Sequence, residues 1–105
     1  MSQYTPDRWV VLEFTHPEHG VFRKVFAGWY GGFAAGDSWK LNSGITVTRI
    51  EDDVYEFDGY SGSTYNCHKS SHGMSGYMAQ VLAGWREKSP ALEIKEIDLE
   101  DVMAS

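Results

Sequence analysis

The sequence predicts an α+β domain: a mostly antiparallel meander sheet of five to seven strands, with one amphipathic helix packed on one face. Period-two alternation of apolar and polar residues recurs through the first two thirds of the chain, and short runs of Gly, Asn, Asp and Ser interrupt it. At about residues 73–88 the apolar period changes to that of a helix. A chain of 105 residues supports one core rather than two, so we expect a single domain over residues 1–105.

The first two strands are predicted to form a hairpin. Residues 8–15 alternate on two faces and are rich in β-branched and aromatic side chains. Pro17 and Gly20 then interrupt the strand, because proline donates no ladder hydrogen bond and glycine readily adopts a positive φ. Alternation resumes over residues 21–30 with apolar side chains on both faces. We therefore expect the second strand to be covered on both sides for part of its length.

The remaining strands are predicted to be short and joined by tight turns. Residues 31–37 contain three glycines and two alanines, which indicates a surface loop. Asn-Ser-Gly, Glu-Asp-Asp and Ser-Gly sequences mark three later turns. The strands predicted between and after these turns cover residues 39–41, 45–50, 54–60, 63–68 and an edge strand within 92–99.

One helix is predicted over about residues 73–88. Six apolar residues fall on a single helical stripe: Met74, Tyr77, Met78, Val81, Leu82 and Trp85. Ser71 or Ser75 is expected to cap its start, and Pro90 to stop it. Gly76 and Gly84 would each cost about 1 kcal/mol in an exposed helix, so we expect the helix backbone to lie close against a flat surface such as a sheet.

Composition excludes several classes of protein. The formal net charge of −6 disfavours direct nucleic-acid binding through bulk positive charge. A single cysteine forms no internal disulfide, which favours a reducing, cytoplasmic location. No apolar run reaches the roughly 18–20 residues that cross a bilayer, and the first residues lack a secretory-signal pattern. We therefore expect no membrane association.

Aromatic side chains are the first candidate binding surface. Trp29, Tyr30, Phe33 and Trp39 surround the glycine-rich segment 31–37. A domain of this size cannot bury all of its 15 aromatic residues, and exposed aromatics beside adaptable loops suit partner binding. The favoured hypothesis is a non-catalytic protein-interaction or ligand-binding module that has another protein as partner and needs no cofactor. Self-association remains open.

Acidic residues support a second hypothesis. The second half of the chain is strongly acidic, and one cluster includes Asp52, Asp53, Glu56 and Asp58. Carboxylates placed where phosphates would lie pair with arginines. On this reading the protein is an acidic inhibitor that mimics nucleic acid and blocks a basic partner.

A third hypothesis is a small zinc-binding or cysteine-dependent enzyme. Cys67, His68 and His72 are soft or borderline ligands, with His16 or His19 as a candidate fourth ligand. Neighbours on a strand point to opposite faces, so Cys67 and His68 make a poor pair. We predict neither a metal site nor a catalytic residue here, and interpret Cys67 as a small buried apolar residue.

Overall fold

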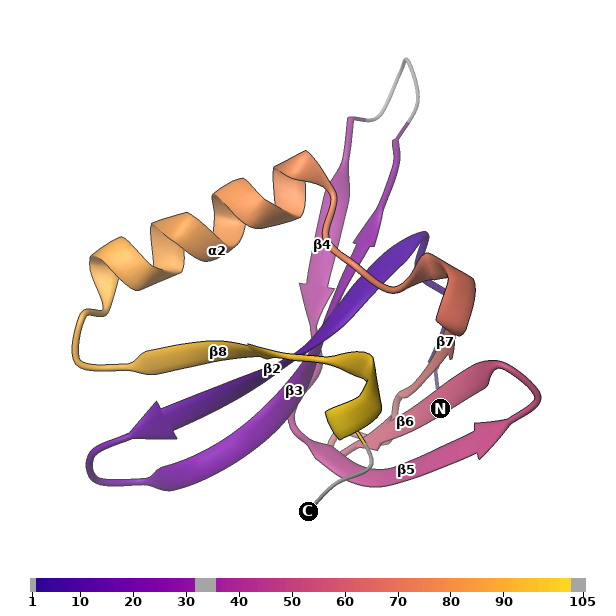
Figure 1. Ribbon diagram of the computed structural model, residues 1–105, viewed down its shortest axis with the longest axis horizontal. Coiled ribbons are helices and arrows are strands. Elements are labelled where there is room, and N and C mark those ends of the chain that lie inside the picture. Colours follow the sequence, from indigo (N-terminus) through magenta and orange to yellow (C-terminus); the bar gives the residue numbers. More distant parts are fainter. Residues whose placement is uncertain (1, 32–35, 103–105) are drawn as a thin grey trace.

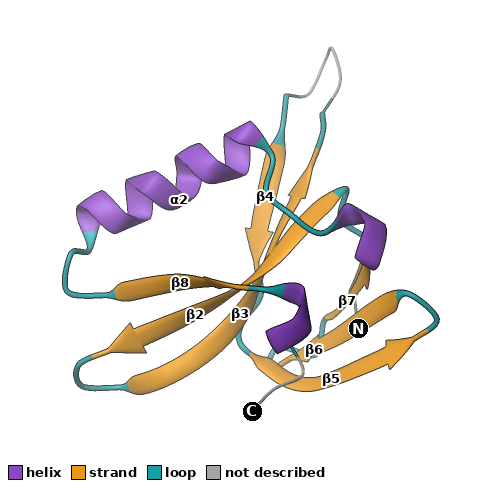
Figure 2. Ribbon diagram, viewed as in Figure 1, coloured by secondary structure: helices purple, strands orange, loops and turns teal. Residues whose placement is uncertain are grey.

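Strands make up a larger part of the chain than helices do in the computed structural model, which describes residues 2–31 and 36–102 (Figures 1 and 2). The strands are β1 (Gln3–Tyr4), β2 (Arg8–His16), β3 (Gly20–Trp29), β4 (Ser38–Leu41), β5 (Ile45–Glu51), β6 (Val54–Gly59), β7 (Thr64–His68) and β8 (Glu93–Ile97). The helices are the 3-10 turns η1 (Lys69–Ser71) and η2 (Leu99–Asp101) and the α-helix α2 (Gly76–Lys88).

The strands form two sheets of four rather than one meander of five to seven. One sheet has the order β4-β3-β2-β8 and the other the order β1-β7-β6-β5. All neighbouring strands are antiparallel except β1, which runs parallel to β7. The predicted α+β class with mostly antiparallel pairing is confirmed, whereas the prediction of a single sheet is wrong. The chain changes sheet between β4 and β5, so β5 pairs with β6 and not with the first hairpin.

Asn42 marks the point where the chain leaves the first sheet. Its main-chain N–H donates to the Val25 carbonyl at 3.0 Å, and its side-chain Oδ1 accepts from the Val25 N–H at 2.8 Å. The side chain therefore takes the place of the main-chain carbonyl that would continue the ladder. The main chain is then free to turn through Ser43 and Gly44 into β5.

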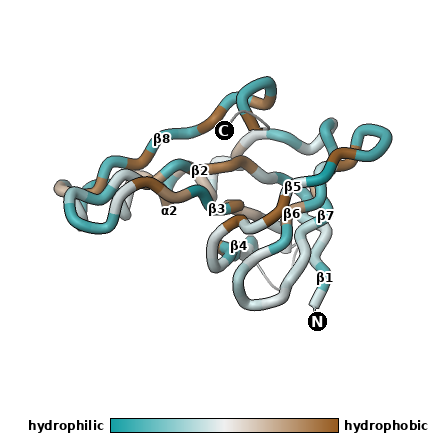
Figure 3. The backbone as a smooth tube through the Cα atoms, turned by 90° about the horizontal axis from the view of Figure 1, so that it is seen from below, coloured by the Kyte–Doolittle hydropathy of each residue, from teal (hydrophilic) through white to brown (hydrophobic). Residues whose placement is uncertain are grey.

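Strand β2 lies at the centre of the molecule, and both of its faces are buried. Val10, Leu12 and Phe14 face α2, whereas Trp9 and Val11 face the second sheet. Figure 3 shows apolar stretches on several strands and on α2, and a polar turn between β5 and β6. The predicted covering of β3 on both sides is confirmed over residues 25–28, all of which are buried.

Helix α2 packs on one face of the β4-β3-β2-β8 sheet, as predicted (Figure 1). Ser75 caps its start, because its Oγ accepts from the Met78 N–H at 3.2 Å. The expected close approach at Gly76 and Gly84 is wrong: a Cβ at either position would meet open space. The close approach lies on the sheet instead, at Gly28, where a Cβ would collide with the Met78 side chain.

Candidate binding site between the two sheets

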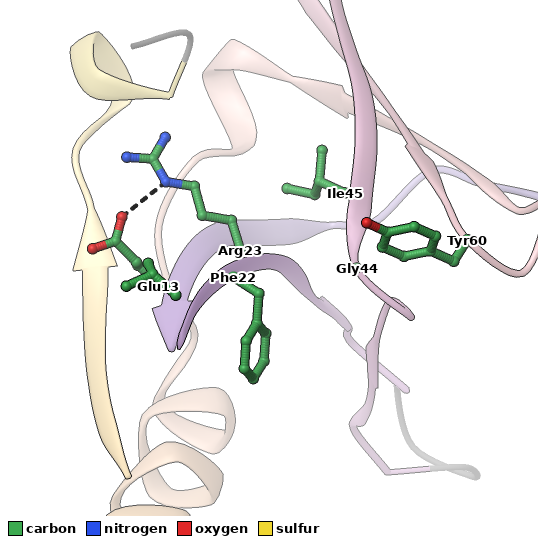
Figure 4. Close-up of a pocket in the computed structure, with 7 residues that line it drawn as sticks. Glu13, Phe22, Arg23, Gly44, Ile45 and Tyr60 are labelled. Atoms are coloured by element: carbon green, nitrogen blue, oxygen red, sulfur yellow. Dashed lines mark hydrogen bonds and ion pairs between the residues drawn. The ribbon is translucent and has the colours of Figure 1, made fainter. Parts of the chain in front are cut away.

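A hollow of about 400 Å³ lies where the two sheets diverge. Strands β2 and β3 form one wall, and the start of β5 with the turn after β6 forms the other (Figure 4). We call this space the inter-sheet hollow. It is lined by Glu13, Val21, Phe22, Arg23, Gly44, Ile45 and Tyr60.

The wall formed by β3 follows from strand alternation. Val21 and Arg23 lie on the same face as Val25, whose side chain is in the core between the sheets. Near the hairpin turn this face is less well covered, and Val21 is 62 % exposed. Phe22 points to the opposite face, where its ring stacks on Phe14 at 5.4 Å.

An ion pair lies on this wall. Arg23 Nε is 3.0 Å from Glu13 Oε2, and these two residues are directly opposite each other in the β2–β3 ladder. Arg23 Nη1 also donates to the main-chain carbonyl of Asp101 at 3.2 Å, which connects the hairpin to η2. The side chains of Arg23 and Glu13 are 27 % and 26 % exposed. The pair therefore places a partly buried, oppositely charged pair of side chains on the wall of the hollow.

The opposite wall is held by the corner between β4 and β5. Tyr60 N–H donates to the Gly44 carbonyl at 3.2 Å, and Ser61 N–H donates to Ser43 Oγ at 2.9 Å. Position 44 requires glycine for two reasons: its φ is +131°, and a Cβ would lie 2.9 Å from two carbon atoms of the Tyr60 ring. Tyr60 is 78 % exposed, so most of its ring remains available for contact.

The inter-sheet hollow combines apolar side chains with an ion pair. Val21, Ile45 and Tyr60 provide apolar surface, and the Arg23–Glu13 pair provides hydrogen-bonding groups beside it. The thiol of Cys67 lies elsewhere, in the core between the sheets. Apolar side chains beside a few placed polar groups are a common feature of sites that hold a ligand, although here the walls are nearly as polar as they are apolar.

The aromatic residues predicted to form one surface lie on opposite faces of the β4-β3-β2-β8 sheet. Trp29 is on the face toward β1, with its Nε1 donating to the Thr5 carbonyl at 3.0 Å. Trp39 is on the helix face, 5.1 Å from the Trp85 ring between centroids. Tyr30 is 57 % exposed at the end of β3. Phe33 lies outside the described residues.

The predicted acidic cluster divides into two parts. Arg49 is 3.0 Å from Glu56 and 2.9 Å from Asp58, so these carboxylates already have a cationic partner on the outer face of the second sheet. Hydrogen bonds from Arg49 and then Thr64 hold the pKa of Asp58 below its usual range. Asp52 and Asp53 are exposed in the turn between β5 and β6. Only this turn therefore presents carboxylates from the cluster without an ion pair among the described residues.

Cys67 and His68 point to opposite faces of β7, as strand alternation predicts. Cys67 is fully buried in the core between the sheets, as interpreted from the sequence, whereas His68 is exposed. Burial raises the pKa of the Cys67 thiol well above its usual range. The thiol is therefore protonated at neutral pH and poorly suited to act as a nucleophile or a metal ligand.

The other histidines form no metal-binding group with Cys67 in the part of the chain that the structure describes. The His72 ring packs edge-on against Trp9 at 4.8 Å, and burial lowers its pKa, although Glu96 acts in the opposite direction. His16 and His19 are in the turn between β2 and β3, which Figure 1 shows at the other end of the molecule from β7. Within residues 2–31 and 36–102, no three His, Cys, Asp or Glu side chains are grouped to hold a metal ion.

None of the residues that line the inter-sheet hollow is among the site residues predicted from the sequence. A signal was present in the first hairpin: Glu13 interrupts the apolar face of Trp9 and Val11, and Arg23 interrupts the same face of β3. Two opposite charges on facing strands indicate an ion pair where the core ends. The sequence has no comparable signal for the second wall. Tyr60 lies on this wall because the chain enters a second sheet after β4, and the sequence does not indicate that change of sheet.

Comparisons with protein-family models, with curated proteins and with solved structures find no match to this chain. Among the residues that the structure describes, no helix combines the length and apolar character needed to cross a membrane.

Proposed function

We propose that the protein is a binding module without a catalytic role, and that it contacts a partner protein through the inter-sheet hollow. The observation that carries this proposal is the pairing of a hollow with exposed apolar side chains at its rim. Val21 and Tyr60 line it and are two of the most exposed large apolar residues in the described chain. Exposed apolar groups around a concave surface are typical of interaction sites.

A segment of a partner protein suits the inter-sheet hollow better than a small molecule does. Small-molecule sites usually bury most of their ligand. Here the rim residues Val21 and Tyr60 remain largely exposed, so a ligand would be covered on one side only. A partner segment would cover these side chains from the other side and would place an apolar side chain between them.

The experiment is a selection of displayed peptides against the purified protein, followed by titration of the selected peptides. Val21→Ser should weaken binding by about tenfold. The methyl groups of Val21 would be buried by the partner segment, and their loss removes roughly 1–2 kcal/mol of contact energy. Val47→Ser is the matched control, since Val47 is also a half-exposed valine but lies on β5, outside the hollow.

Equal binding by wild type and Val21→Ser, or no selected peptide at all, would contradict the proposal. The acidic-inhibitor hypothesis predicts a different outcome: binding that weakens steeply with salt and depends on Asp52 and Asp53. If binding shows that pattern and Val21→Ser has no effect, the binding site is the β5–β6 turn and not the inter-sheet hollow.

A further inference from the structure

We propose that the partner segment carries a basic side chain beside its apolar one, and that this basic side chain binds in a second hollow next to the inter-sheet hollow. The inference rests on the proposed function and specifies the chemistry of the partner. The second hollow has a volume of about 400 Å³. Among the described residues that line it, all except Ile97 are charged, and we call it the acidic hollow: Glu13, Arg23, Lys95, Glu96, Asp98 and Asp101.

The two hollows meet at the Arg23–Glu13 ion pair, which lines both of them. In Figure 4 the Arg23 side chain points toward β8 and η2, whereas Ile45 and Tyr60 lie on its other side. A peptide segment that crosses the ion pair would therefore contact both hollows at once. Its apolar side chain would enter the inter-sheet hollow, and a neighbouring side chain would enter the acidic hollow.

Three neighbouring strands and η2 position the charged groups of the acidic hollow. Glu13 on β2 is directly opposite Arg23 on β3 and directly opposite Lys95 on β8, so the charges alternate across this row. Asp98 immediately precedes η2, and Asp101 is its last residue. Arg23 Nη1 donates to the Asp101 carbonyl at 3.2 Å, which holds η2 beside the row.

The acidic hollow has an excess of carboxylates. Glu13 is already paired with Arg23, and Lys95 is the further cation among the described lining residues. Three exposed carboxylates have no ion pair with a Lys, Arg or His side chain in the described part of the chain: Glu96, Asp98 and Asp101. Like charges gathered around one hollow repel each other, and a cation among them relieves this repulsion. Charge complementarity therefore favours a basic side chain as the occupant.

The arrangement of these carboxylates suits a side chain better than a metal ion. No three His, Cys, Asp or Glu side chains in residues 2–31 and 36–102 are grouped to hold a metal. A guanidinium or ammonium group carries several N–H donors at the end of a long stem, so it can contact carboxylates that are too widely spaced for one metal ion. The partner is thus a segment with an apolar residue and a nearby Lys or Arg.

The peptides selected against the protein are the probes for this inference. Those that depend on Val21 should contain a Lys or Arg near their apolar residue. Replacing that basic residue by Gln should weaken binding to the wild type by about three- to tenfold, as expected for a cation among several partly exposed carboxylates. Raising the salt concentration from about 0.05 M to about 0.5 M should reduce the same contribution.

A double-mutant cycle locates the cation. In the Asp98→Asn, Asp101→Asn double variant, the same Gln replacement in the peptide should change the affinity by less than about twofold. These substitutions remove charge and preserve known contacts, because the Asp98 side chain makes no capping hydrogen bond and Asp101 accepts from Arg23 through its main chain. The Asp52→Asn, Asp53→Asn double variant is the matched control, since it loses the same charge outside both hollows.

The outcomes separate this inference from the proposed function. If the selected peptides depend on Val21 but contain no basic residue, or if the Gln replacement has the same effect in the wild type and in the Asp98, Asp101 double variant, the inter-sheet hollow is correct and the acidic hollow is not part of the site. A loss confined to the Asp52, Asp53 control variant would refute the inference in the same way. If no selected peptide depends on Val21, the proposed function itself fails.

Discussion

Asn42 and Val25 exchange two hydrogen bonds, of which one uses the side chain of Asn42 and the other its main chain. Because the side chain of Asn42 takes the place of a main-chain acceptor, the β3–β4 ladder ends here and the chain continues into the second sheet. These two hydrogen bonds therefore affect the whole architecture. The inter-sheet hollow lies between the sheets because the chain leaves β3 after Asn42 and enters β5.

Asn42→Ala should lower the free energy of unfolding by about 1–3 kcal/mol, because it leaves the buried Val25 N–H without an acceptor. Urea unfolding followed by tryptophan fluorescence measures this change. Asn66→Ala is the control: its side chain donates to Gln3 in an exposed contact, so its loss should have little effect. An Asn42→Ala variant as stable as the control would show that the side-chain hydrogen bond does not hold the corner.

Two glycine substitutions should change stability in opposite directions. Gly84→Ala should stabilise the protein by roughly 0.5–1 kcal/mol, because the position is inside α2 and a Cβ there meets open space. Gly28→Ala should destabilise it by about 1–3 kcal/mol, because a Cβ would displace Met78 from the core. Thermal unfolding of both variants tests the prediction, which fails if Gly28→Ala is neutral or if Gly84→Ala destabilises.

The Cys67 thiol should react with a disulfide reagent far more slowly in the folded protein than in urea. Its side chain is fully buried and its pKa is raised by burial, so both access and thiolate formation are suppressed. Labelling at pH 7 with and without denaturant measures the ratio. Rapid labelling of the native protein would contradict the buried position of Cys67 and would revive the hypothesis of a reactive cysteine.

His72 should make the protein less stable as the pH falls below about 6.5. Burial lowers the pKa of His72 in the folded protein, so the unfolded chain takes up the proton more readily. The effect is absent above the unfolded pKa of about 6.5 and grows as the pH falls toward the lower folded value. Glu96 and Asp98 favour the charged form and Arg8 opposes it, so they modify the size of the effect.

Unfolding free energies of His72→Gln and wild type between pH 7.5 and about pH 5 isolate this contribution. The difference between the two proteins should narrow or reverse as the pH falls, because only wild type loses stability through this group. His68→Gln is the control, since His68 is exposed. Parallel pH profiles for wild type and His72→Gln would rule out the linkage.

Local patterns were sufficient to predict α2 and every strand except β1. Alternation identified β2 and β3, the apolar stripe identified α2, and Ser75 was one of the two expected caps. The burial of Cys67 followed from its place in the alternating strand. These features depend on neighbours within a few residues, and their physical causes are strand and helix periodicity, capping and turn chemistry. Strand β1 escaped prediction because two residues carry no period.

The site depended on contacts between residues distant in the chain. Arg23 and Tyr60 line the same hollow although 37 positions separate their numbers (60 − 23). Whether Asn-Ser-Gly joins two strands of one sheet or carries the chain to another depends on whether the Asn42 side chain finds the Val25 N–H. The sequence by itself determined which longer segments become strands and which becomes the helix. Only the tertiary structure decided which strands are neighbours, because pairing is chosen by the burial of whole faces rather than by the residues of one strand.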